Sequence, residues 1–302
     1  MTNRAFRQEH LQPKGGDFMF GGVSPTEVAK RTWAEIRADD VFGRAAQLAY
    51  YFFLALFPFL IFVIASLSVF GYADRGRAVM FQVVSRLLPG PASQLISSTF
   101  EAILRSGGPL KMSFGIVFSV WSASMGMSAL LDTLNAIYRV KEKRSLVKQY
   151  AIAIGLTVGL GILIVFTVLI VVFGNDLVEG VSHGGLLSIV WNVARWPLGI
   201  AVLLFAFAIT YYFAPDVANR KWHWVTPGAI AGTVLLTIVS IGLRIYLRYA
   251  GTSPDEYGPL GAVIVLLLAF YLCGIALLSG GALNGVLDGI ATADSRGSHA
   301  SD

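Results

Sequence analysis

Six stretches of this chain are almost free of charged residues, and each is long enough to cross a bilayer, which takes roughly 20 apolar residues. They cover residues 45–73, 112–131, 149–175, 184–215, 222–243 and 257–287, and the one formal charge inside them is Arg195. The runs are continuous and do not alternate between polar and apolar residues. They therefore predict helices and exclude the strands of a membrane barrel. We predict an all-α, polytopic membrane protein whose six transmembrane helices form a bundle.

The apolar runs also set the domain organisation. We expect one membrane domain over 24–287, flanked by a flexible N-terminus over 1–23 and a flexible tail over 288–302. The spans are predicted at about 46–70, 112–134, 150–174, 188–213, 226–248 and 259–286. Only 14% of the residues are charged, whereas a soluble domain carries about a quarter. The single cysteine, Cys273, excludes an internal disulfide framework.

Lys and Arg gather in the segments that six spans would place on one side of the membrane. Before the first span lie Arg4, Arg7, Lys14, Lys30, Arg31, Arg37 and Arg44, and after the second lie Arg139, Lys141, Lys143, Arg144 and Lys148. The loops around 175–185 and 250–256 contain neither residue type, and the long first loop weighs less in this rule. We therefore expect a multi-pass membrane protein with cytoplasmic N- and C-termini. The net charge of +5 then reflects topology and not nucleic-acid binding.

Two regions outside the spans carry amphipathic helical patterns. Ser24 and Glu27 form a capping-box pattern with Pro25 at the first helical position, which predicts a helix over 25–38. That helix either lies on the inner leaflet or packs under the bundle. A Pro-Gly-Pro sequence splits 76–105 into two further amphipathic pieces, which form either an interfacial cap or a re-entrant hairpin.

Pairs of glycines four residues apart recur in the predicted spans. They are Gly155/Gly159, Gly228/Gly232 and Gly281/Gly285. Such pairs let helix backbones approach closely, so they predict a compact bundle. Contact between two copies of the chain is the alternative, which leaves a homo-oligomer open.

Motifs for catalysis do not stand out. The histidines lie in termini and loop edges, without partners at metal-ligand spacing. Neither a phosphate-cradling glycine-rich loop nor a Gly-x-Ser-x-Gly elbow is present. Asp, Glu and Lys are absent from the helix interiors, where ion-coupled transporters place such groups. We expect no enzyme activity, no catalytic residue, no metal, no cofactor and no nucleic-acid partner.

Ten polar residues in or near the spans are candidates for contacting a lipid. Three arginines near the predicted outer ends either snorkel to the headgroups or hold a lipid phosphate with their fork-shaped donors: Arg195, Arg244 and Arg248. Three residues at the inner end of the second span either cap that helix and meet headgroups or line an inner vestibule: Asn135, Tyr138 and Arg139. Four more offer neutral hydrogen bonds near cytoplasmic helix ends: Tyr50, Tyr51, Tyr212 and Asn284.

Several short runs carry a family resemblance when they are taken together and in order. They are AAQLAYYF at 45–52 with LFP at 56–58, LNAIYRV at 134–140 with Arg144, Tyr212 with Pro215-Asp216, PGA at 227–229, YGPLGAVI at 257–264, and Leu283-Asn284. The chain resembles the YihY/BrkB family of bacterial inner-membrane proteins, long mislabelled ribonuclease BN, from about 29 to 286. Relatives often carry a glutamate where this chain has Ala282, so no role of that glutamate is transferred.

The resemblance implies a multi-pass protein of the bacterial inner (plasma) membrane with a role in the cell envelope. We expect transport or flipping of lipids or other amphiphiles, with membrane lipids as partners. The alternative is a non-transporting protein that organises the envelope. A cavity between helices that opens to the lipid would favour transport, and a sealed interior would favour the alternative. The older ribonuclease label finds no support, because phosphodiester hydrolysis would need a metal-binding set of carboxylates or histidines.

Overall fold

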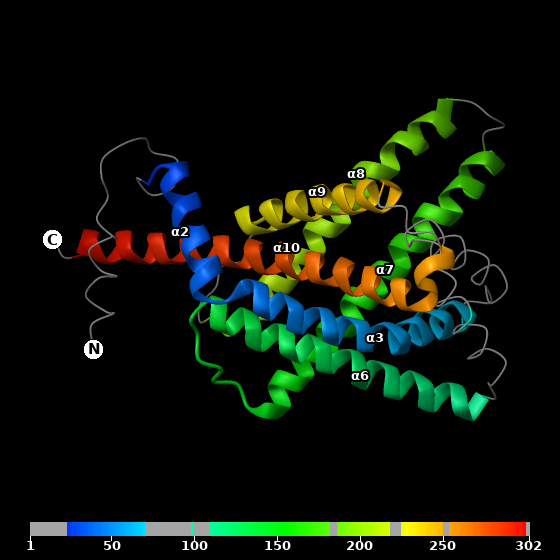
Figure 1. Cartoon of the computed structure of the whole chain (residues 1–302), viewed down its shortest axis with the longest axis horizontal. Coiled ribbons are helices and arrows are strands. Elements are labelled where there is room, and N and C mark those ends of the chain that lie inside the picture. The colour runs from blue at the N-terminus through cyan, green and yellow to red at the C-terminus, as the bar shows by residue number, and fades with distance from the viewer. Residues whose placement is uncertain are drawn as a thin grey trace.

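The structure is a computed structural model that describes residues 23–69, 98, 109–181, 186–217, 225–249 and 254–299. Within these residues the secondary-structure elements are seven α-helices (Figure 1). They are α2 (Pro25–Ala38), α3 (Val41–Val69), α6 (Pro109–Ile137), α7 (Leu146–Val181), α8 (Leu186–Phe213), α9 (Pro227–Tyr249) and α10 (Pro254–His299). The predicted all-α class is confirmed.

Four of the described helices are long and apolar enough to cross a membrane: α7, α8, α9 and α10. The apolar part of α3 that the structure describes fully, Val41–Leu56, is shorter. α9 exposes an apolar stripe in which each side chain is at least 52% exposed: Val234, Ile238, Ile241 and Ile245. A contiguous apolar face of this kind is buried in a soluble protein, so here it lies against hydrocarbon.

The long helices pack as neighbours in chain order around α10. α10 lies along α3 and α9, and it also contacts α2 and α6. Further contacts join α3 to α6, α6 to α7, α7 to α8, and α8 to α9, and smaller ones join α2 to α3 and α3 to α7. Figure 1 shows α10 crossing the middle of the view, with α3 and α6 below it and α9 above.

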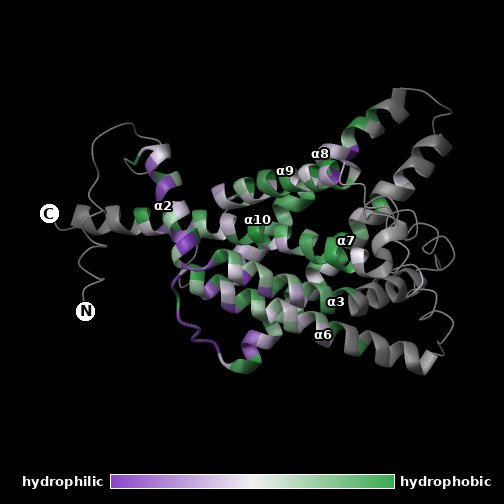
Figure 2. Cartoon of the chain, viewed as in Figure 1, coloured by the Kyte–Doolittle hydropathy of each residue, from purple (hydrophilic) through white to green (hydrophobic). Residues whose placement is uncertain are grey.

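One end of the bundle collects the polar contacts between helix ends. There the Arg139 side chain, just after α6, pairs with Glu35 of α2, and Arg144, just before α7, pairs with Asp216, which follows α8. Successive long helices therefore run in opposite directions. We call this the basic end, because the segment 138–145 and the first turn of α7 carry its lysines and arginines. Figure 2 shows the hydrophilic colouring concentrated in α2 and in this segment.

α2 begins as predicted and packs against the bundle. The Ser24 hydroxyl accepts a hydrogen bond from the Glu27 backbone N–H at 3.3 Å, and Pro25 occupies the first turn. Val28 is buried against Ile290 of α10. Of the two arrangements considered for this helix, the structure therefore shows packing on α10.

The helix ends differ from the predicted spans. α3 begins earlier, at Val41, and α10 continues to His299. Residues 288–299, which we expected to belong to a flexible tail, are thus helical. The predicted flexible segment 1–22 and all but one residue of the amphipathic pieces in 76–105 lie outside the described residues.

The glycine pairs have opposite roles in the bundle. A Cβ on Gly228 would collide with the carbonyl oxygen of Gly280, so α9 and α10 touch backbone to backbone. A Cβ on Gly232 would lie 3.2 Å from the carbonyl oxygen of Ala276, also on α10. By contrast, nothing lies within 4 Å of a Cβ built on Gly155 or Gly159. The prediction that this last pair packs helices is wrong for contacts within the described chain.

Candidate functional site

A buried arginine organises the basic end. Arg144 binds Glu142 through two parallel hydrogen bonds of 2.7 Å, from Nε to Oε1 and from Nη2 to Oε2. Its Nη2 also donates to the Ala214 carbonyl at the C-terminus of α8, at 2.8 Å. An arginine in this position satisfies carbonyls that lack partners within their own helix and complements the helix dipole.

Asn135 completes this Arg144 cluster, which consists of Asn135, Glu142, Arg144 and Asp216. Its Nδ2 donates to Glu142 Oε2 at 2.8 Å, and its Oδ1 accepts the Asp216 backbone N–H at 2.7 Å. The cluster therefore ties together the end of α6, the start of α7 and the end of α8. The hydrogen bond from Arg144 lowers the pKa of Glu142 to about 2, so this carboxylate is ionised near neutral pH.

Arg139 ends α6 in a left-handed conformation. Its φ is 55°, its N–H bonds the Ala136 carbonyl, and the Val140 N–H bonds the Asn135 carbonyl, both at 3.0 Å. These are the two bonds of a Schellman motif, in which glycine usually occupies the left-handed position. The Arg139 side chain forms an ion pair with Glu35 of α2. The motif therefore fixes the direction in which the Arg139 side chain extends from the end of α6.

Asn284 caps a neighbouring helix. Its Oδ1 accepts the Gly228 N–H at 2.8 Å in the first turn of α9, and its Nδ2 donates to Thr226 Oγ1 at 3.0 Å. Thr226 itself caps α9, since its hydroxyl lies 3.1 Å from the Ala229 N–H. Asn284 is only 4% exposed. We assign it, like the equally buried Asn135, a role in holding helices together.

The four predicted tyrosines divide by environment. Tyr138 is partly buried against the hydrophobic core. Tyr50 is 57% exposed on α3, and its ring meets that of Tyr51 edge-on at 5.8 Å. Tyr212 packs edge to face on Phe213, with 4.8 Å between ring centroids. The predicted neutral residues therefore lie at several places and not in a single described cavity.

The arginines predicted at the outer side lie on two adjacent helices. Arg195 is half-buried on α8, Arg244 is exposed on α9, and the side chain of Arg248 lies outside the described part of the chain. In the part of the chain that the structure describes, Arg195 and Arg244 form no hydrogen bond or ion pair. Snorkelling and phosphate binding both stay predictions for this set.

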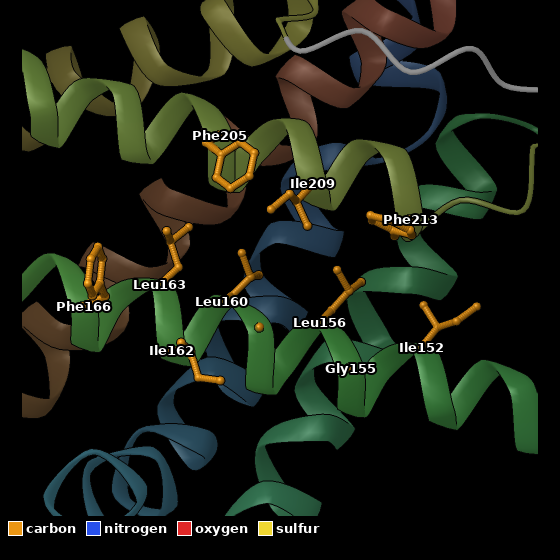
Figure 3. Close-up of a pocket in the computed structure, with 11 residues that line it drawn as sticks. Ile152, Gly155, Leu156, Leu160, Ile162, Leu163, Phe166, Phe205, Ile209 and Phe213 are labelled. Atoms are coloured by element: carbon orange, nitrogen blue, oxygen red, sulfur yellow. The ribbon is translucent and has the colours of Figure 1, made fainter. Parts of the chain in front are cut away.

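A groove of about 460 Å³ runs between α7 and α8. Figure 3 shows Leu156, Leu160 and Leu163 reaching from α7 towards Phe205 and Ile209 of α8. Its full lining is apolar: Ile152, Gly155, Leu156, Gly159, Leu160, Ile162, Leu163, Phe166, Phe205, Ile209 and Phe213.

Two glycines open this groove. Gly155 and Gly159 lie on its α7 wall, and the absence of their side chains leaves open space where a packed helix pair would have contacts. Ile162, Phe166 and Phe213 are about half exposed at its edges, so the groove opens on the lipid-facing surface of the bundle. The contact between α7 and α8 therefore leaves a groove that is open towards the lipid.

A second cavity, of about 650 Å³ and lined mostly by charged residues, lies at the basic end. We call it the basic pocket, and its lining is Arg139, Val140, Lys141, Lys143, Arg144, Ser145, Lys148 and Asp216. Of the inner residues predicted from the sequence, Arg139 lines it. In the sequence, Lys141, Lys143 and Lys148 indicate only the orientation of the chain. The signal for this pocket is their close spacing, with two of them in the loop after α6 and one in the first turn of α7.

Within the described residues, no set of three or more His, Cys, Asp or Glu side chains has an arrangement suitable for holding a metal ion. The ion pairs at the basic end are instead carboxylates bound to arginines, which leaves those carboxylates with satisfied charges.

Known proteins resemble this chain over most of its length. The profile of a family described as virulence factor BrkB matches residues 32–302. The ribonuclease-like protein YfkH of Bacillus subtilis (strain 168) is 36% identical over 251 residues, which are 81% of this chain and 89% of that protein. The UPF0761 membrane protein Smlt0865 of Stenotrophomonas maltophilia (strain K279a) is 30% identical over 83% of this chain.

A UPF0761 membrane protein of Xanthomonas campestris pv. campestris (strain B100) is 28% identical over a similar length. The chain spans only 58% of the length of each UPF0761 relative, so those proteins contain further sequence. No solved structure matches the chain.

Proposed function

The chain belongs to the BrkB family of membrane proteins, and on that premise we propose that it moves lipids or other amphiphiles across a bacterial inner membrane. The observation that carries the proposal is the apolar groove between α7 and α8. A closed, fully packed bundle would offer a lipid nothing to bind. A lipid-facing groove lets acyl tails associate with the protein while they stay in hydrocarbon.

The physical difficulty in moving a lipid lies in its headgroup. An isolated charge is costly at the bilayer centre, whereas the tails need no polar path and no closed pore. Cationic and hydrogen-bonding groups lie at both ends of the route that we propose. At the basic end these are the groups of the basic pocket, and Arg195 and Arg244 lie further along α8 and α9.

The proposal includes a topology of six spans with cytoplasmic termini. α3 and α6 are each 29 residues long, beyond the roughly 20 that a span needs. They run antiparallel to their neighbours, as the four more apolar helices do. The lysine-rich segment at the basic end favours the cytoplasmic side under the positive-inside rule. The packing of α2 on the last turns of α10 supports an even number of crossings.

Reconstitution into liposomes with a fluorescent phospholipid tests transport. Dithionite bleaches label in the outer leaflet, so loss of fluorescence beyond that fraction measures movement between leaflets. We expect movement with the wild-type chain and a large reduction when Gly155→Leu and Gly159→Leu fill the groove. The matched control is Gly199→Leu with Gly242→Leu, because a Cβ at either site also meets open space. Wild-type vesicles that behave like protein-free vesicles would contradict the proposal.

A second candidate is a non-transporting protein that organises the envelope, through lipids or as a homo-oligomer. It is favoured by the close packing at α9 and α10, where Gly228 and Gly280 leave no space between the backbones. Under this candidate the groove would hold a bound lipid or another helix permanently. Lipid retention through purification without movement in the vesicle assay would support it.

We also propose that the chain is not an enzyme and does not bind nucleic acid. Because the B. subtilis relative is named a ribonuclease-like protein, ribonuclease activity is the enzyme activity to test. Highly purified protein is expected to leave transfer-RNA precursors intact with and without divalent cations. Metal-dependent cleavage that survives purification and disappears in Glu142→Gln or Asp216→Asn would overturn this.

A further inference from the structure

The basic pocket and the groove meet at the start of α7. Lys148 lines the pocket and Ile152 lines the groove. Four residues apart, they share a face of the helix and are separated by about 6 Å along its axis. On the α8 side, Phe213 lines the groove while its carbonyl accepts a hydrogen bond of 3.3 Å from Arg144, which lines the pocket.

The charges in the pocket are unequally compensated. Arg144 is bound by Glu142 and Asp216, and Arg139 by Glu35. Lys141, Lys143 and Lys148 are exposed, and in the described residues none of them forms an ion pair. The positive end of the α7 dipole adds to them, since Ser145 caps this helix beside the pocket.

The groove has the dimensions of a lipid tail. It extends along α7 from Ile152 to Phe166, which is about 21 Å at 1.5 Å per residue. One leaflet of a bilayer contributes about 15 Å of hydrocarbon. A fully extended acyl chain from the leaflet at the basic end therefore fits within the groove.

We propose that pocket and groove form one site for an anionic phospholipid of the cytoplasmic leaflet. The phosphate lies among Lys141, Lys143 and Lys148, and one acyl chain lies along the groove between α7 and α8. This inference rests on the proposed function in lipid handling and names the substrate class and the point of entry. Charge complementarity selects the headgroup, because the three lysines, which form no ion pair within the described residues, favour a net negative lipid over a zwitterionic one.

Titration of lipids into the purified full-length chain, followed by native mass spectrometry, tests the site. The probes are palmitoyl-oleoyl phosphatidylglycerol, phosphatidylcholine with the same chains, and inorganic phosphate. We expect the wild type to prefer phosphatidylglycerol. Changing Lys141, Lys143 and Lys148 to glutamine should weaken that binding at least about tenfold. The same three positions changed to arginine should retain it, which separates charge from folding.

A second set of variants tests whether the groove contributes to lipid binding. Gly155→Leu with Gly159→Leu is compared with the control Gly199→Leu with Gly242→Leu. We expect the first pair to weaken phosphatidylglycerol binding and the second to leave it unchanged. Unchanged binding after both the lysine-to-glutamine and the groove-filling changes would overturn the site. Phosphate binding that depends on the lysines while lipid binding ignores the groove would also overturn it, because the ligand would then be a free phosphate.

These results are separable from the vesicle assay. A wild-type chain that binds phosphatidylglycerol through the lysines and the groove but moves no lipid supports the site and contradicts transport. Lipid movement that persists at full rate in variants whose phosphatidylglycerol binding is also unchanged supports transport and overturns the site.

Discussion

Asn284 of α10 accepts a hydrogen bond of 2.8 Å from the backbone N–H of Gly228, in the first turn of α9. The N-terminal N–H groups of a helix have no partner within the helix, and in a membrane protein water does not reach them freely. Asn284 therefore caps α9 from a neighbouring helix, whereas an N-cap residue belongs to the helix that it caps. The same amide bonds Thr226, so α10 holds both the cap and the first turn of α9.

Removing this link should destabilise the bundle. We expect Asn284→Ala to lower the free energy of unfolding by about 1–2 kcal/mol, which is the cost of losing a cap and leaving a buried donor unsatisfied. Thr237→Val is the control, because that hydroxyl is bonded to the Thr233 carbonyl of its own helix and joins no helices. Thermal unfolding in detergent measures both. Equal melting temperatures for Asn284→Ala and Thr237→Val would contradict the capping role.

Two substitutions that each add one methyl group should differ in their effect on stability. Gly228→Ala places a Cβ against the Gly280 carbonyl oxygen, so α9 and α10 must separate. Overpacking of this kind costs about 1–3 kcal/mol. Gly155→Ala meets no atom within 4 Å and raises helix propensity, so it should leave stability unchanged or increase it by up to about 1 kcal/mol. The melting temperatures of the two variants are compared with that of the wild type. A Gly228→Ala variant as stable as the wild type would contradict the backbone contact between α9 and α10.

The left-handed conformation of Arg139 makes a prediction about two substitutions at one site. Both Arg139→Gly and Arg139→Ala remove the ion pair with Glu35. Only glycine adopts φ 55° without steric cost. The glycine variant should therefore be more stable than the alanine variant by about 1 kcal/mol. Denaturation of the two variants side by side measures this difference, and a more stable alanine variant would exclude the Schellman geometry.

Glu142 should make the stability of the fold depend on pH in the acid range. Its pKa is lowered from 4.5 to about 2, chiefly by the hydrogen bond from Arg144. A carboxyl whose pKa is lower in the folded state stabilises the fold above its unfolded pKa, and this contribution is lost as the pH falls towards the folded pKa. Glu142→Gln keeps the side-chain size but does not titrate. The gap in melting temperature between wild type and this variant should shrink between about pH 5 and pH 3. A gap that stays constant over that range would contradict the pKa shift.

Much of the fold follows from local sequence, because a charge-free run in a membrane has helix as its available structure. The helix ends follow less well. α10 passes its predicted end at 286 and continues to His299. Ile290 packs there against Val28 of α2, at the far end of the sequence. A contact between such distant residues leaves no local signal.

The candidate site also depends on contacts that local sequence does not reveal. Gly155/Gly159 and Gly228/Gly232 look alike in sequence, yet one pair opens a groove and the other packs against α10. The difference depends on which helix faces each glycine. The sequence indicates Asn135 as a candidate, but its role depends on Glu142 and Asp216, which lie seven and 81 residues away.

The orientation of the basic end is the last prediction. In a Cys273→Ala background, a cysteine at Ser145 should react with a membrane-impermeant maleimide only in inverted vesicles, because that exposed residue lies beside the lysines of the basic pocket. A cysteine at Tyr249, which is 83% exposed at the opposite end of α9, should react in intact spheroplasts. Positive-inside loops and one crossing by α9 require this pattern. Labelling of the Ser145 position in intact spheroplasts would place the basic pocket outside the cell and exclude a cytoplasmic-leaflet lipid as its ligand.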